Sequence, residues 1–154
     1  NVGILTATSI KVGTGVTLSS DGDAFVTGVS TATKFVGDLS DAVTGRWAIA
    51  NNGNSNYTFT GPGGLSAASN STLYLARGQT YEFNMNASGH GFGVQTSSGT
   101  WNSSNEYTTG ITNAKAAVGV IKFAVPYTAP NTLYYACTSS HSGMVGSIVV
   151  YPSI

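Results

Sequence analysis

The chain has 154 residues, of which only 8% are charged, and its formal net charge is zero. An ordinary soluble domain has about 25% charged residues, so Gly, Ser, Thr and Asn must cover most of the surface here. A neutral surface lacks the basic footprint of a nucleic-acid-binding protein and the polybasic patch that attracts anionic lipid. No apolar run approaches the roughly 20 residues of a membrane helix. We therefore expect no nucleic-acid partner and no insertion into a membrane.

Residues 1–45 contain an internal repeat. The segment GILTATSI at 3–10 recurs 25 positions later as GVSTATKF, with Gly- and Asp-rich turns and β-branched residues between the two copies. So short a region cannot bury much apolar surface by itself. Repeated β-segments without a core of their own usually stack on neighbours or on identical chains. We interpret residues 1–45 as a β-repeat stalk or fibre segment, and the start at Asn1 as a sign of a processed or partial chain.

Residues 46–154 have the pattern of a compact all-β domain. Apolar and polar residues alternate along 81–85, where Tyr81, Phe83 and Met85 share one face of the expected strand. Gly- and Pro-rich turns separate the segments, and strands at this spacing are typical of a two-sheet sandwich. The predicted strands are 46–50, 57–60, 72–76, 80–85, 92–96, 118–125, 132–137 and 145–151.

The polar stretch 101–115 is expected to be a long loop with a helical turn. Trp101 and Tyr107 lie among Asn and Ser residues there, a mixture that is also found in adaptable binding loops. A carbohydrate-binding surface is therefore one interpretation of this loop. We favour the other interpretation, in which Trp101 packs under its own loop.

Four residues form the strongest chemical signal in the chain. Its single Cys, Cys137, lies within eight positions of His141 and Met144, and the other histidine, His90, lies 47 positions before Cys137. One thiol, two imidazoles and one thioether are the ligand set of a mononuclear type 1 copper site. In such a site His90, Cys137 and His141 would be equatorial ligands of one copper ion and Met144 the axial ligand.

A structural role for each of these residues stays open beside the copper site. Cys137 could be an inert buried thiol at the end of an apolar strand, and Met144 could fill the core. His90 and His141 could be ordinary loop residues. We expect no enzyme and no catalytic residues, because no carboxylate lies near His141 to orient it and four protein ligands would leave the metal without an open position.

Two stretches of the second region resemble the cupredoxins. LARGQTYEFN at 75–84 and GHGF at 89–92 are similar to a strand, glycine turn and strand followed by the first copper histidine of that family. YAC at 135–137, with His141, Met144 and GSIVV at 146–150, is similar to its ligand loop and closing strand. The resemblance implies a Greek-key β-sandwich of cupredoxin type. The short spacing of the ligand loop is closest to a dinuclear copper domain, but Leu133 stands where that domain has a second Cys.

The repeat in residues 1–45 resembles repeats of tail-fibre and other virion appendage proteins of marine bacteriophages. This resemblance implies a homotrimer on a virion surface, with identical chains and other virion or surface proteins as partners. Our leading hypothesis is therefore a structural virion appendage that displays a cupredoxin-like domain. The alternatives are a secreted mononuclear blue-copper electron-transfer protein and an extracellular, cell-surface adhesin or lectin-like module.

Overall fold

The structure is a computed structural model that describes residues 10–12, 16–18, 24–26 and 43–152. The chain divides into two units, Asn1–Asp38 and Leu39–Ile154. In the described part there is no helix long and apolar enough to cross a membrane.

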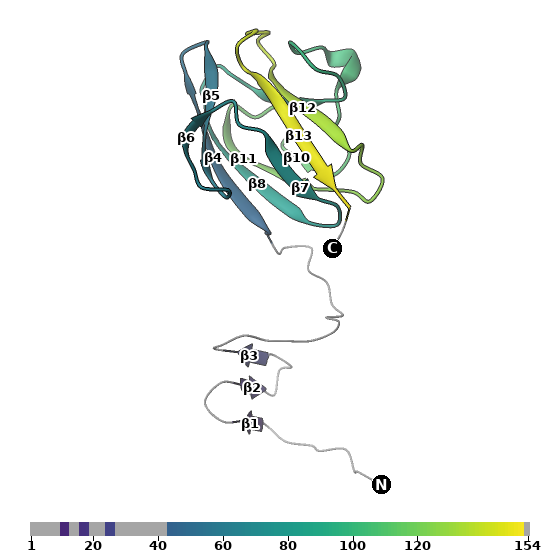
Figure 1. Cartoon of the computed structure of the whole chain (residues 1–154). Coiled ribbons are helices and arrows are strands. Elements are labelled where there is room, and N and C mark those ends of the chain that lie inside the picture. Colours follow the sequence, from purple (N-terminus) through teal and green to yellow (C-terminus); the bar gives the residue numbers. More distant parts are fainter. Residues whose placement is uncertain (1–9, 13–15, 19–23, 27–42, 153–154) are drawn as a thin grey trace. The chain divides into compact units, whose positions relative to one another are not determined.

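The first unit contains a small antiparallel sheet with its strands in chain order (Figure 1). These strands are β1 (Ile10–Val12), β2 (Val16–Leu18) and β3 (Ala24–Val26). Most of the predicted repeat lies outside the described residues, so the stalk interpretation stays a prediction.

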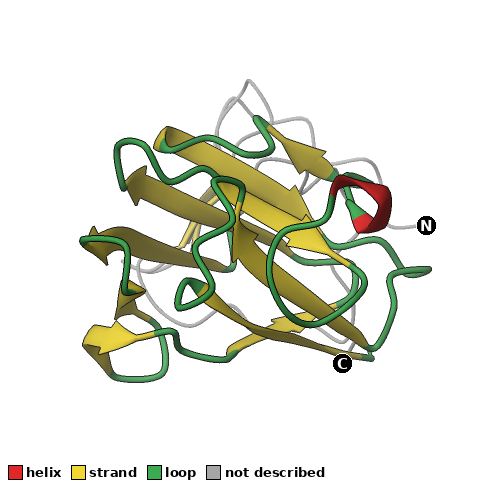
Figure 2. Cartoon of the chain, turned by 90° about the horizontal axis from the view of Figure 1, so that it is seen from above, coloured by secondary structure: helices red, strands yellow, loops and turns green. Residues whose placement is uncertain are grey.

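The second unit is a sandwich of two mixed sheets, as Figures 1 and 2 show. The larger sheet has the order β10 (Ile111–Thr112), β11 (Val118–Ala124), β8 (Thr80–Asn86), β4 (Gly45–Asn52), β5 (Asn56–Gly61) and β6 (Leu65–Ser69). The smaller sheet has the order β7 (Leu73–Ala76), β13 (Val145–Tyr151), β12 (Thr132–Cys137) and β9 (Phe92–Gln95). Two pairs, β4 with β8 and β7 with β13, are parallel, and the others are antiparallel. The predicted all-β sandwich is confirmed.

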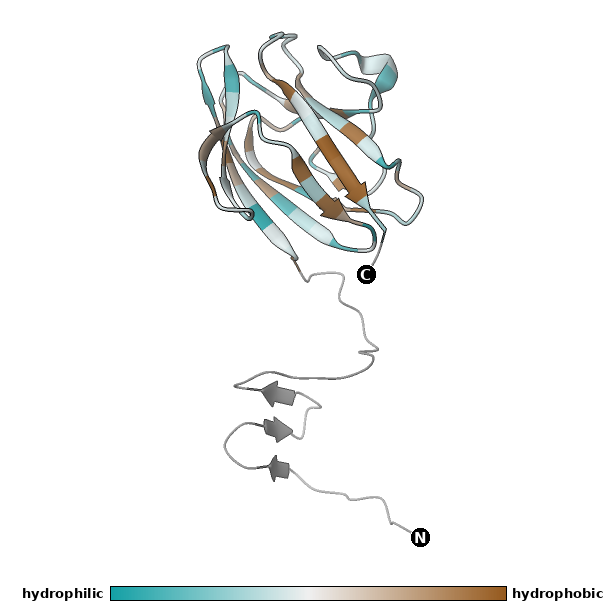
Figure 3. Ribbon diagram, in the orientation of Figure 1, coloured by the Kyte–Doolittle hydropathy of each residue, from teal (hydrophilic) through white to brown (hydrophobic). Residues whose placement is uncertain are grey.

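Strand β8 buries one face, as the alternation in the sequence predicts; Figure 3 colours the strands by the hydropathy of their residues. In β8, Tyr81, Phe83 and Met85 are buried, whereas Asn84 is exposed and Glu82 is half-buried. Successive side chains of a strand point to opposite faces, so this pattern directs every second residue of β8 into the space between the sheets.

Aromatic rings join the two sheets. Five fully buried aromatic side chains form a cluster between the sheets. The larger sheet contributes Tyr57 and Phe59 of β5 and Phe83 of β8, and the smaller sheet contributes Phe92 of β9 and Tyr135 of β12. The ring centroids are 5.3 Å apart between Tyr57 and Phe92, and 5.5 Å apart between Phe83 and Phe92. Such aromatic pairs each contribute about 0.5 to 1.5 kcal/mol beyond the burial of their area. This cluster fixes β9, which begins two residues after His90, and β12, which ends at Cys137.

Two strands were not predicted. β6 is mostly exposed, contains Ala67 at a φ of 50° and has an irregular register with β5, while β10 has only two residues. The expected helical turn in the polar loop is the 3-10 helix η1 (Ser103–Asn105), capped by Asn102 (Figure 2). A Cβ added at Gly93 would collide with the ring of Trp101, so Trp101 packs against strand β9; its packing under its own loop stays a prediction.

Candidate metal centre

The pairing of β9 with β12 brings His90 close to Cys137. In this register Cys137 lies opposite Phe92, two residues after His90. The chain reaches that point from β8 through a turn in which Gly89 has a φ of 82°, and the His90 amide donates to the Ala87 carbonyl at 2.8 Å. A left-handed φ of this kind favours glycine. The turn therefore carries the chain from the larger sheet to the smaller one with His90 at its end.

The loop from Cys137 to Met144 is closed by its own backbone hydrogen bonds. The Ser140 amide donates to Cys137 O at 2.9 Å, the Met144 amide to His141 O at 3.0 Å, and the Cys137 amide to Met144 O at 3.0 Å. Cys137 and Met144 thus lie side by side at the base of the loop, where β12 ends and β13 begins at Val145. The hydrogen bond from the Met144 amide to His141 O holds the backbone of His141 in the same loop.

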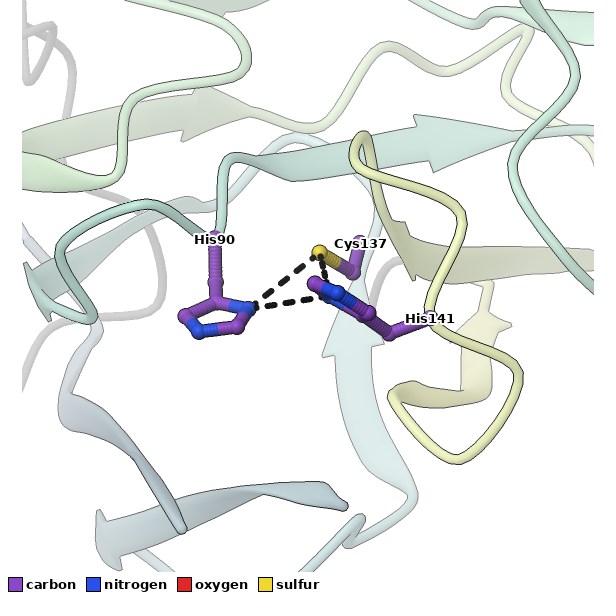
Figure 4. A group of neighbouring side chains, drawn as sticks. All are labelled: His90, Cys137 and His141. Carbon is purple, nitrogen blue, oxygen red and sulfur yellow. Dashed lines mark hydrogen bonds between the residues drawn. The ribbon is translucent and has the colours of Figure 1, made fainter. Parts of the chain in front are cut away.

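Three of the four predicted ligand residues point toward one another, as Figure 4 shows. The Nδ1 atoms of His90 and His141 are 3.1 Å apart, and the Cys137 Sγ atom lies 3.7 Å from the first and 3.4 Å from the second. Cys137 is fully buried, His90 is 8% exposed and His141 is half-buried. Within residues 43–152, no Asp or Glu belongs to this group.

This triangle has the size of a metal's equatorial plane. A metal about 2.0 Å from each nitrogen and about 2.3 Å from the sulfur, as in zinc sites, separates the nitrogens by about 3.5 Å and nitrogen from sulfur by about 3.7 Å at trigonal angles. The observed edges of 3.1, 3.4 and 3.7 Å are close to these values. Thiolate and imidazole suit copper, whereas calcium and magnesium need oxygen ligands. The residues present therefore fit a copper ion.

Met144, the fourth predicted ligand, is fully buried beside the triangle's own loop. Its backbone makes hydrogen bonds to both Cys137 and His141. The residue before it, Gly143, lies close to the larger sheet. A Cβ added at Gly143 would collide with the Ser55 carbonyl of the β4–β5 turn. The larger sheet therefore presses on the loop one residue before Met144.

Two residues around the centre carry no signal in the sequence pattern. The Tyr57 hydroxyl donates to the carbonyl oxygens of His90 and Gly91 at 2.9 and 3.0 Å. Burial raises the pKa of the Tyr57 phenol far above its usual range, and the neighbouring Cys137 thiol raises it further. The Asn70 side chain donates to Gly143 O at 2.6 Å. Both residues come from segments far from the ligands in sequence, so only the fold reveals them.

Comparisons with known proteins give solved structures but no sequence relatives. No protein-family model matches the chain, and no curated protein matches it. The copper protein rusticyanin matches with a TM-score of 0.46 and 17% identity over 69% of this chain and 76% of that one. Rusticyanin from Thiobacillus ferrooxidans matches with a TM-score of 0.42 and 17% identity, again over 69% and 76%. Similarity at this level says nothing of function, which has to be inferred from the geometry of the centre.

Proposed function

We propose that this chain is a mononuclear copper protein of the blue-copper type that carries single electrons. The observation that carries the proposal is the convergence of two imidazole nitrogens and one thiol sulfur on a single point, with mutual separations of 3.1 to 3.7 Å. The ligand chemistry of the three residues selects copper over hard cations. Copper supplies a one-electron couple when it is bound.

In this proposal His90, Cys137 and His141 are the equatorial ligands and Met144 is the axial ligand. The first three come from two segments that β-sheet pairing and the closed ligand loop hold in place. Ligands fixed in this way keep nearly the same arrangement in both oxidation states, which favours electron transfer. With four protein ligands there is no open coordination position for a substrate, so we propose no enzymatic activity.

The path of the electron is proposed to pass through His141. Cys137 and Met144 are fully buried and His90 is nearly so, whereas His141 is half-buried and is the most exposed residue of the set. A redox partner can approach its ring more closely than any other part of the centre. This assignment requires no movement of the ligand loop.

The other hypotheses stay predictions. The virion-appendage hypothesis, the homotrimer and the virion-surface location depend on residues 1–45, most of which lie outside the described residues. The adhesin or lectin-like module depends on a ligand surface around Trp101, whose ring packs on Gly93. A secreted, extracellular location remains an expectation that accompanies the electron-carrier proposal.

Titration of the metal-free protein with copper tests the proposal. We expect one copper per chain, an intense blue or violet absorption from the Cys137 thiolate, and reversible bleaching on one-electron reduction. Light scattering on the same sample gives the oligomeric state and thus separates a monomeric carrier from a trimeric appendage. A protein that binds no copper, or binds it without the intense absorption, contradicts the proposal.

A further inference from the structure

We infer that Tyr57 and Asn70 are positioning residues that tie both ligand-bearing loops to one point on strand β5 and so set the geometry of the metal centre. The inference rests on the proposed function, because it concerns how well the centre holds copper. Neither residue is a ligand. Asn70 acts through the backbone of the segment that carries Met144. Tyr57 acts through the backbone of the segment that carries His90, and its hydroxyl also neighbours the Cys137 thiol.

Tyr57 holds the segment that carries His90. Its hydroxyl donates to His90 O and Gly91 O at 2.9 and 3.0 Å, in a fully buried position. The Thr138 amide also donates to Gly91 O, at 2.9 Å, so this carbonyl links the two ligand-bearing segments. The Tyr57 ring is wedged against Phe92, which leaves the hydroxyl little freedom to move.

Asn70 holds the segment that carries Met144. Its side-chain amide donates to Gly143 O at 2.6 Å, from a position directly after β6 in the larger sheet. Asn70 has a φ of 43°, a left-handed conformation that Asn tolerates better than most residues. The Gly143 carbonyl belongs to the peptide bond that joins Gly143 to Met144. The hydrogen bond from Asn70 therefore fixes the backbone directly before the proposed axial ligand, Met144.

The two residues are bound to each other as a reciprocal pair. The Asn70 backbone amide donates to Tyr57 O at 2.9 Å, and the Tyr57 backbone amide donates to Asn70 Oδ1 at 3.0 Å. The support for the His90 segment and the support for the Met144 segment therefore have a common origin on β5. A displacement of this pair moves both sides of the metal centre together.

Outer contacts of this kind affect metal affinity and redox potential. They orient the ligands before the metal arrives, and their loss typically lowers metal affinity about 10- to 100-fold. A merely structural role would lower the stability of the metal-free protein and leave the properties of the bound copper unchanged. Copper affinity, spectrum and potential therefore separate the two roles.

The first test compares Tyr57→Phe with Tyr81→Phe. Both changes remove one tyrosine hydroxyl, but the Tyr81 hydroxyl accepts from the Ala76 amide at 2.9 Å, near the start of β8 and away from His90, which follows its end. We expect copper affinity, measured by competition with a chelator, to fall about 10- to 100-fold in Tyr57→Phe and to stay at the wild-type value in Tyr81→Phe. Thermal melts of the metal-free proteins establish that both variants fold.

The second test compares Asn70→Asp with Asn105→Asp. Aspartate at 70 keeps the acceptor for the Tyr57 backbone amide and loses the donor to Gly143 O. Aspartate at 105 adds the same charge where the side-chain amide donates to Ser97 Oγ at 2.7 Å, in the loop that follows the far end of β9. We expect a shift of the visible absorption maximum and of the reduction potential in Asn70→Asp and in that variant alone.

Both comparisons have to succeed. Equal copper affinities of the two Phe variants, or equal spectra and potentials of the two Asp variants, would overturn the inference while the proposed function stands. If Tyr57→Phe does not fold, the Asn70 comparison alone decides. A wild-type protein that binds no copper rejects the proposed function itself and this inference with it.

Discussion

The segments that precede and follow strand β8 make different kinds of side-chain contact. At the end that precedes Thr80, the Arg77 guanidinium donates to Ala129 O at 2.8 Å and to Asn131 Oδ1 at 2.7 Å. Each of these contacts joins a donor to an acceptor. At the other end, beyond Asn86, the shortest side-chain contacts of the centre join His90 Nδ1, His141 Nδ1 and Cys137 Sγ.

The difference lies in which atoms meet at each end, and it marks the end at which a metal is proposed. The contacts of Arg77 are complete without a ligand, since its guanidinium has only donors and they meet only oxygen acceptors. The centre instead brings together three atoms that can each donate or accept, the two ring nitrogens according to their tautomers and the sulfur according to whether it carries its proton. Without a cation, they can be held together only by protons shared among the two rings and the thiol. A soft cation satisfies all three atoms at once, and this contrast is the physical basis of the proposed function.

Removal of the thiol should have the largest effect. Copper at about 1,000 times its dissociation constant stabilises the folded wild-type protein by about 4 kcal/mol. In Cys137→Ser we expect this copper-dependent stabilisation and the intense absorption to disappear. Thermal melts with and without copper measure the first and absorption spectra the second. A Ser variant that keeps the intense band would contradict the assignment of Cys137 as a ligand.

A methyl group at the base of the ligand loop should have the next largest effect. Gly143→Ala forces the added Cβ against the Ser55 carbonyl, and overpacking of this kind costs about 1 to 3 kcal/mol. Because Met144 is the next residue, the copper spectrum should change as well. Gly45→Ala, where the added Cβ meets its nearest atoms at an ordinary contact distance of 3.4 Å and the backbone is not left-handed, is the control for steric crowding. An unchanged melting temperature and spectrum in Gly143→Ala would show that the loop yields freely.

A change at the opposite end should lower stability without affecting copper. Arg77→Met removes the donors to Ala129 O and Asn131 Oδ1 but keeps much of the apolar stem. We expect a loss of about 1 to 2 kcal/mol in urea unfolding, a charged hydrogen bond discounted for partial exposure. The copper spectrum should match the wild type. A shifted spectrum would mean that the Arg77 contacts and the metal centre are coupled, which would contradict their independence.

The smallest effect is expected on the outer face of the larger sheet. Arg46 and Glu82 form an ion pair at 2.6 Å with an exposed Arg46 side chain. Exposed pairs of this kind contribute about 0 to 1 kcal/mol and are screened by salt. Glu82→Gln should therefore change unfolding in urea by less than about 1 kcal/mol, and the difference should shrink at high salt. A larger loss that salt does not reduce would assign Glu82 a packing role.

The sequence predicted much of the sandwich and the core of the centre because both have a local signature. Alternation marked β8, and the clustering of Cys137, His141 and Met144 marked the ligand loop. β6 escaped prediction because it is mostly exposed and irregular at Ala67, and its residues show no alternation. Tyr57 and Asn70 each act through one polar group on a residue far along the chain. Tyr57 is 33 positions from His90 and Asn70 is 73 positions from Gly143, separations at which no sequence pattern links two residues.

The most direct test of the copper centre is X-ray absorption at the copper edge on the loaded protein, together with a crystal structure that uses copper anomalous scattering. We expect one copper bonded to His90 Nδ1, His141 Nδ1 and Cys137 Sγ, at about 2.0 Å from nitrogen and a slightly longer distance from sulfur. A copper bound without sulfur, or at a surface site away from Cys137, would contradict it.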